Sequence, residues 1–189
     1  ASDVYKRQAI IGVTVEESPH VFVVQVWEKP DNEAADWQVP VLEVEDCIRQ
    51  AAMKFQVLEI ACDPYRWART FQILEDENLP VVLFPQSPAR MTPATSRFYE
   101  AVMNQTMTHD TNPTFARHIG NAQMRTDNRG SRLAKESRNS ARRIDLAVAS
   151  VMGLERAAWW HAQRSNATPL IFDPWEGDVD ASPVFDDWN

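Results

Sequence analysis

Apolar residues near the start of the chain form runs typical of β-strands, followed by a spacing typical of an amphipathic helix. Residues 9–15 and 20–28 are rich in β-branched and aromatic side chains, and Ser18-Pro19 interrupts them, so the sequence predicts a two-stranded hairpin. In residues 44–55, apolar side chains recur at helical spacing with charged residues between them. One helix is therefore expected to pack on this hairpin.

The middle of the chain repeats the order of strand and helix. Residues 57–62 and 79–84 are predicted strands, and residues 65–78 form the predicted helix between them. Residues 86–93 are rich in turn residues and are expected to form a loop before a helix over residues 95–104. A hairpin followed by strand, helix, strand and helix predicts an α/β fold with a mixed sheet flanked by helices.

The last part of the chain contains two further helical patterns. Residues 113–123 form the first, and residues 143–162 form the longest predicted helix of the chain. Between them, residues 124–136 predict two short extended pieces around a turn at residues 127–130. Residues 164–189 set acidic side chains among prolines and tryptophans, which predicts an acidic, disordered tail.

Length and composition predict a single domain over residues 9–163. The chain has 189 residues, of which 44% are hydrophobic, enough for one sizeable core. No run approaches the roughly 20 apolar residues that span a bilayer, and Cys47 and Cys62 have no metal-ligand spacing, so a cytosolic protein is expected. Residues 3–8 resemble the translation of a sequencing adapter, and residues 1–8 are therefore treated as a scar preceding the natural chain.

The first candidate for chemistry is Asp63, which directly follows the predicted strand of residues 57–62. Open α/β sheets place their chemistry at the carboxyl ends of strands, so a carboxylate there is a site candidate. A helix N-cap is an equally good interpretation, because Asp is a preferred capping residue and Pro64 follows it.

The second candidate is Asp145, which stands between apolar neighbours at the opening of the longest helix. An acidic residue in a first turn is also favoured by the helix macrodipole alone. Together, Asp63 and Asp145 would make a carboxylate site for Mg²⁺ or Mn²⁺, because these ions take one or two protein carboxylates and complete their shell with water and phosphate oxygens.

A basic run lies between Asp63 and Asp145 in the chain. It contains Arg117, Arg125, Arg129, Arg132, Lys135, Arg138, Arg142 and Arg143. Such runs are usually solvated surface, but the net charge of the chain is -8, and positive charge gathered beside an acidic site favours contact with a DNA backbone. No base-reading motif accompanies the run, so binding independent of sequence is expected.

Several short segments resemble a known family when they are taken together. They are Ala61–Trp67, Leu79–Val82, Ser96–Tyr99, Met107–Asp110, Ala116–Ala122 and Arg143–Ala149. In this order and spacing they resemble the C-terminal nuclease domain of the large terminase subunit of tailed bacteriophages. The resemblance extends from Ala9 to about Trp160.

This resemblance implies an RNase H-like fold and a two-metal endonuclease that cuts concatemeric double-stranded viral DNA in the host-cell cytoplasm. Asp63 matches the second acidic metal ligand of the family and Asp145 the last. His118 and Asn121 match its His-x-x-Asn-Ala signature and are expected beside the site rather than as ligands; His109, in another family-like segment, has the same status.

The chain departs from the family at its start. The family's first metal-binding aspartate lies on the first, central strand of the sheet, and nothing before Ala9 matches it; Asp3 belongs to the adapter-like segment. The Gly-rich phosphate loop of the terminase ATPase is not found either. We therefore expect a truncated, inactive nuclease with a gap in its sheet.

The partners implied by the resemblance are double-stranded DNA, the terminase ATPase domain, the small terminase subunit and the portal, with no membrane. Two other classes remain open from the sequence. One is a Holliday-junction resolvase or integrase-like nuclease with the same fold and carboxylates, and the other is a module that binds DNA or a portal without catalysis.

Overall fold

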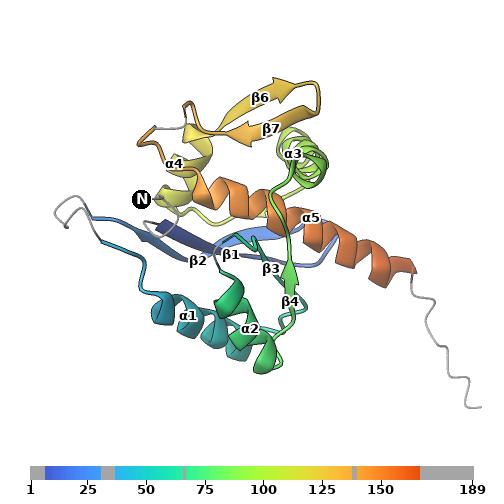
Figure 1. The fold of residues 1–189 in the computed structure, drawn as a ribbon. Coiled ribbons are helices and arrows are strands. Elements are labelled where there is room, and N and C mark those ends of the chain that lie inside the picture. Colours follow the sequence, from blue (N-terminus) through green and yellow to red (C-terminus); the bar gives the residue numbers. More distant parts are fainter. Residues whose placement is uncertain (1–6, 31–36, 66, 138–139, 167–189) are drawn as a thin grey trace, which may run out of the picture.

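The structure, a computed structural model, describes residues 7–30, 37–65, 67–137 and 140–166 (Figure 1). Strands β1 (Arg7–Val13) and β2 (His20–Glu28) form the predicted antiparallel hairpin, which confirms the strand order at the start of the chain. The short strand β5 (Thr108–His109) lies parallel to β2 on its other edge. Arg7 and Gln8, from the adapter-like segment, are the first residues of β1.

A second sheet contains the parallel strands β3 (Ile60–Cys62) and β4 (Val81–Leu83). Helix α2 (Ala68–Asp76) connects them. The sequence predicts a mixed sheet with a gap, and the described strands form separate sheets, with pairing that ends at β1 on one side and at β3 on the other. The reason is that no described strand lies between these two edges to bridge them.

Helices cover both faces of these strands (Figure 1). Helix α1 (Val41–Lys54) and α2 lie on one face, where Trp27, Ile48 and Leu74 are buried together. Helix α5 (Asp145–Asn166) crosses the opposite face and packs on β1. Of the predicted tail, residues 164–166 continue α5, and residues 167–189 lie outside the described part of the chain. None of the described helices is long and apolar enough to cross a membrane.

The remaining elements pack beyond α5. They are helices α3 (Pro88–Met103) and α4 (Pro113–Asn121) and the hairpin of β6 (Gln123–Asp127) and β7 (Gly130–Ala134). The predicted turn at residues 127–130 is confirmed, and Gly130 takes the positive φ of 99° at its end.

Helix α3 begins earlier than the sequence predicts. Residues 88–93, expected to be a loop because of their two prolines, form its first turns. Pro88 is the first residue of the helix, where a backbone N–H has no intrahelical acceptor and its absence therefore costs nothing. Met91 and Ala94 are buried in the cluster shared with α5, so tertiary packing supports the helix through Pro93. The other element ends shift by a few residues only.

Candidate functional site

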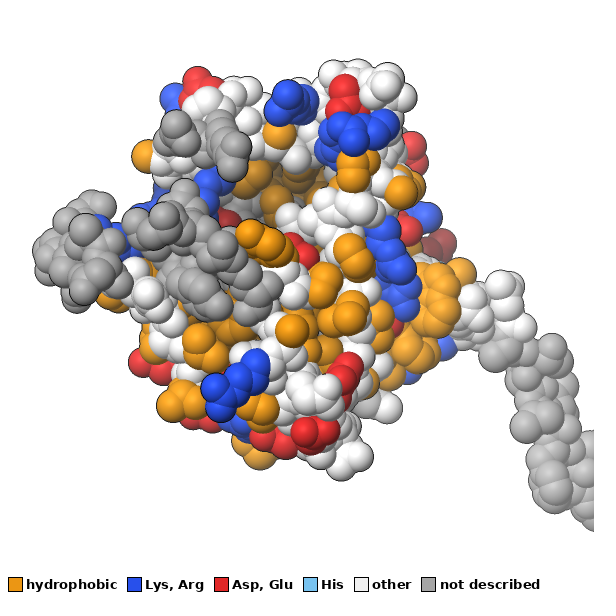
Figure 2. Space-filling model, in the orientation of Figure 1, with side chains coloured by type: hydrophobic (Ala, Val, Ile, Leu, Met, Phe, Trp, Pro, Cys, Tyr) orange, Lys and Arg blue, Asp and Glu red, His pale blue; other side chains and the backbone are white. Residues whose placement is uncertain are grey.

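A groove of about 860 Å³ lies between the edges of β1 and β3 that pair with no other strand of the described residues. Helix α5 forms one wall and α1 contributes Val44, Ile48 and Ala51 to the opposite wall. Figure 2 shows apolar side chains exposed across the middle of the face in view, where these strands lie in Figure 1. Both predicted carboxylates, Asp63 and Asp145, line this groove.

Asp63 directly follows β3, at the carboxyl end of the strand. Its Oδ1 accepts a hydrogen bond of 3.2 Å from the Tyr65 N–H. Helix α2 begins later, at Ala68, with Trp67 in the N-cap position and no side-chain cap. The N-cap interpretation of Asp63 is therefore wrong, and the strand-end interpretation describes its position.

Asp145 lies at the opening of α5, as predicted, and is the first residue of the helix, which begins two residues later than expected. Its Oδ1 lies 3.3 Å from Nε of Arg7 on β1. Its Oδ2 is buried and has no hydrogen-bond partner among the described residues. A buried carboxylate oxygen without a donor is suited to a cation or to a bound water. The macrodipole of α5 favours the negative charge at this position as well.

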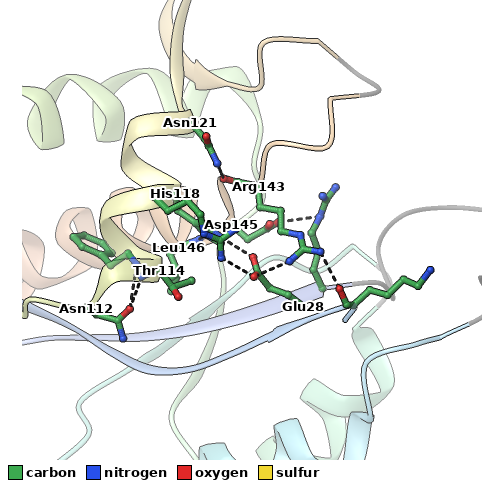
Figure 3. A network of polar contacts seen from close by, with 12 residues as sticks. Glu28, Asn112, Thr114, His118, Asn121, Arg143, Asp145 and Leu146 are labelled. Carbon is green, nitrogen blue, oxygen red and sulfur yellow. Dashed lines mark hydrogen bonds and ion pairs between the residues drawn. The ribbon is translucent and has the colours of Figure 1, made fainter. Parts of the chain in front are cut away.

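The sequence signature of His118 and Asn121 holds the segment that carries Asp145 (Figure 3). Helix α4 is capped by Asn112, whose side chain accepts from the Thr114 and Phe115 N–H groups. One turn of α4 then separates the two signature residues. Nδ1 of His118 accepts a 3.0 Å hydrogen bond from the Leu146 N–H, and Nδ2 of Asn121 donates to the Arg143 carbonyl at 3.0 Å. The two contacts lie on either side of Asp145.

The hydrogen bond from Leu146 settles which nitrogen of His118 carries the proton. Because Nδ1 is an acceptor, Nε2 carries the proton and donates to Glu28 Oε1 at 2.7 Å. His118 has an exposed fraction of 0%, and this burial lowers its pKa more than the nearby Glu28 raises it. The imidazole is therefore neutral in this fold and serves as a fixed link between Glu28 and α5.

Glu28, at the end of β2, is the main residue of this network that the sequence analysis did not select. Besides His118, it accepts from Arg117 and Arg143, each at 2.7 Å (Figure 3). Its burial alone would raise its pKa, but hydrogen bonds from Arg117, His118 and Arg143 outweigh burial and hold the pKa below its usual value. The signal available for Glu28 was the same as for Asp63, an acid at the end of a strand.

His109 lies apart from the groove. It is exposed on β5, and its Nδ1 hydrogen-bonds to the Asp110 carbonyl. The centroid of its ring lies 5.4 Å from the centroid of the Phe115 ring. The structure therefore places His118 and Asn121 next to a candidate carboxylate, and does not place His109 there.

The basic run divides into paired and exposed side chains. Arg132 is bound to Asp127 at 2.6 Å and Arg143 to Glu28, which makes them part of the scaffold. Arg129 and Arg142 remain about 60% exposed despite ion pairs. Two further members differ from these: Arg125 is exposed on β6, and Lys135 lines the groove. Arg138 lies outside the described residues.

Asp63 and Asp145 are the predicted carboxylates that line the groove. Within the described residues, no group of three or more His, Cys, Asp or Glu side chains is placed to hold a metal ion. Mg²⁺ usually takes one or two carboxylates from a protein, so Asp63 and Asp145 are the candidates among the groove residues to hold such an ion. Water and phosphate oxygens would complete the shell of one such ion.

Solved structures with a similar fold come from phage terminases. The crystal structure of the HK97 bacteriophage large terminase aligns with a TM-score of 0.61 and 18% identity, over 79% of this chain and 39% of that chain. The large terminase nuclease from thermophilic phage G20c with bound magnesium aligns with a TM-score of 0.54 and 8% identity, over 79% of this chain and 82% of that chain. The structure of the G20c nuclease with bound cobalt aligns with a TM-score of 0.51 and 9% identity, over 79% of this chain and 81% of that chain. The fold class is therefore that of phage large terminase nucleases.

Sequence similarity identifies the protein family to which the chain belongs. A family model described as "Terminase large subunit, endonuclease domain" matches residues 23–162. The chain belongs to this family, which confirms the resemblance found in the sequence. Among the curated proteins, none is significantly similar to this chain. The chain spans 39% of the HK97 large terminase.

Proposed function

We propose that this domain is the Mg²⁺- or Mn²⁺-dependent endonuclease of a phage DNA-packaging terminase and that its substrate is concatemeric double-stranded DNA. The observation that carries this proposal is the position of Asp63 and Asp145 on one groove, with the buried Oδ2 of Asp145 left without a partner among the described residues. A bound divalent ion would activate a water and stabilise negative charge on the phosphodiester.

The residues around the carboxylates take three roles in this proposal. Asp63 and Asp145 hold the ion, and His118 and Asn121 keep the start of α5 in place through Leu146 and Arg143. Arg125, Arg129 and Arg142 contact phosphates from outside the groove. The ATPase domain, the small terminase subunit and the portal are the proposed partners, in the cytoplasm of the host cell.

Metal binding by the chain tests the proposal directly. Titration with Mn²⁺, followed by the electron paramagnetic resonance signal of the free ion, is expected to show a site that Asp63→Asn or Asp145→Asn weakens at least about tenfold. Asp76→Asn is the matched control, because Asp76 is exposed on α2 and does not line the groove. Equal Mn²⁺ affinity in all four proteins would contradict the proposed site.

Nicking of supercoiled plasmid by this chain is expected to remain near background. Two carboxylates can place one ion, whereas in-line displacement by two ions needs ligands for both attacking and leaving oxygens. The assay compares plasmid nicking in Mn²⁺ with nicking in a chelator. Strong Mn²⁺-dependent nicking that Asp63→Ala abolishes would show that the described carboxylates already form a complete site.

DNA affinity is expected to depend on the exposed arginines. Arg125→Ala should weaken binding to duplexes of any sequence by a similar factor and reduce the slope of log K against log salt by about 0.9. Fluorescence anisotropy at several salt concentrations measures both quantities. Arg69→Ala, an exposed arginine on α2, should change neither. If both variants lower the slope equally, the basic run has no special part in binding.

A further inference from the structure

Three exposed arginines form a positive surface on the β6–β7 hairpin and on the segment that follows it. This arginine surface contains Arg125, Arg129 and Arg142. Arg125 lies directly opposite Arg132 on the neighbouring strand, and it has no ion-pair partner among the described residues. Like charges that face each other across a hairpin repel, so this surface is suited to an acidic ligand.

The hairpin turns its arginines away from the core. Side chains alternate between the two faces of a strand, so Leu133 lies on the opposite face from Arg125 and Arg132. Leu133 packs against the buried cluster shared by α3 and α5, and the face of Arg125 is therefore the outer one. Figure 2 shows Lys and Arg side chains at the top of the face in view, where Figure 1 places β6 and β7.

Acidic side chains of the described residues neutralise the arginine surface only in part. Asp127 lies 2.6 Å from Arg132 and 3.3 Å from Arg129, so one carboxylate serves two guanidinium groups. Arg142 lies 3.4 Å from Glu136, and at least half of each side chain is exposed. Exposed pairs of this kind contribute about 1 kcal/mol or less, so a second acidic group can replace them.

The opposite charge is concentrated at the other end of the chain, in residues 167–189. This acidic segment contains six of the 27 acidic side chains and none of the 19 Lys and Arg side chains. The six acids are Asp173, Glu176, Asp178, Asp180, Asp186 and Asp187. Trp175 and Trp188 stand among them, and a guanidinium group stacks on Trp as well as pairing with a carboxylate. The acidic segment is therefore the chemical complement of exposed arginines.

Helix α5 links the arginine surface to the acidic segment. It begins at Asp145, shortly after Arg142, and its 22 residues extend for about 33 Å. A chain as long as the acidic segment spans about 25 Å as a coil and up to roughly 75 Å when extended. The segment can therefore return along α5 to the arginine surface. Attachment to the same chain gives it an effective concentration in the millimolar range.

We propose that the acidic segment binds the arginine surface of its own chain and competes there with DNA phosphates. The inference rests on the proposed function only for the identity of the competitor, which is DNA. Binding of a duplex then exchanges carboxylates for phosphates on the same guanidinium groups, so the acidic segment lowers the affinity of the domain for DNA of any sequence. Because the contact is ionic and exposed, salt weakens it.

The contact is tested in the full chain, without DNA or metal, by the NMR signals of the arginine Nε–H groups. Changing all six acids of the segment to Asn or Gln should shift the signals of Arg125, Arg129 and Arg142. The signal of Arg69, which is exposed on α2, should stay in place. Wild-type signals should be independent of protein concentration, as expected of a contact within one chain. Unchanged arginine signals in the variant, or a contact that disappears on about tenfold dilution, would overturn the proposal.

Competition with DNA is tested by two variants with the same change in net charge. One removes three charges from the acidic segment through Glu176→Gln, Asp178→Asn and Asp180→Asn. The other removes three exposed charges at the end of α2 through Glu75→Gln, Asp76→Asn and Glu77→Gln. At low salt, fluorescence anisotropy with a labelled duplex should show at least about threefold tighter binding by the first variant than by the second.

Equal DNA affinities of these two variants would show that net charge alone is responsible and would overturn the competition. Failure of every variant to bind DNA would contradict the proposed function, whereas the arginine signals decide the contact of the acidic segment by themselves. The two failures are therefore distinguishable.

Discussion

Replacing His118 with leucine is expected to lower the free energy of unfolding by about 2–4 kcal/mol, because a buried main-chain N–H and a carboxylate lose their partner together. His118 has an exposed fraction of 0%, and it joins Leu146 to Glu28 through its two nitrogens. Leucine has a comparable size, so lost hydrogen bonds rather than a cavity should account for the effect. Thermal unfolding should show a decrease in Tm of roughly 5–15 °C.

Two further variants separate the parts of this effect. His118→Asn can keep an acceptor for the Leu146 N–H while losing the contact with Glu28, so its stability should lie between wild type and His118→Leu. His109→Leu, at an exposed position outside the groove, should change stability little. At temperatures where His118→Leu is fully folded, a loss of Mn²⁺ affinity would show that His118 also positions Asp145. Unchanged stability of His118→Leu would refute its role as a link.

Glu28→Gln is the second large expected effect, a loss of about 2–3 kcal/mol at pH 7. The neutral amide can no longer balance Arg117 and Arg143, and His118 loses a charged acceptor. Urea unfolding at constant pH measures the difference. Glu77→Gln, which removes an exposed partner of Arg49, is the control and should have little effect.

The effect of Glu28→Gln should depend on pH in a direction that the structure specifies. Since the pKa of Glu28 is lower in the folded state than its ordinary value of 4.5, the carboxylate stabilises the fold fully above that value. This stabilisation is lost as the pH falls through the folded-state pKa. The stability difference between wild type and Glu28→Gln should therefore shrink below pH 4.5 and stay constant between pH 6 and 8. A difference that is the same at acid and neutral pH would contradict the charged role of Glu28.

Local pattern was sufficient for the elements whose apolar spacing is strong. The hairpin of β1 and β2, helices α1, α4 and α5, and the β6–β7 turn all follow from periodicity and turn residues. The start of α3 did not follow, because two prolines predict a loop locally while burial of Met91 and Ala94 against α5 favours a helix. Local preference and tertiary packing disagreed there, and packing prevailed.

In the candidate site, too, local pattern predicts some features and tertiary structure decides others. Asp63 and Asp145 were identified from their positions at a strand end and a helix start, and a basic run beside them was visible in the sequence. Which of the arginines would be neutralised was not visible, because the partner of Arg143 is Glu28, which lies 115 positions earlier in the chain. Ion pairs between distant segments leave no local pattern, so the sequence treated the whole run alike.

Family, element order and the two carboxylates can thus be read from the amino-acid sequence, since each depends on residue type and spacing along the chain. Three features emerge only in three dimensions: the separation of β1 from β3, the buried link from Glu28 through His118 to Leu146, and the oxygen of Asp145 that has no partner among the described residues. Their physical reason is common to all of them: hydrogen-bond satisfaction and burial depend on which distant segments meet.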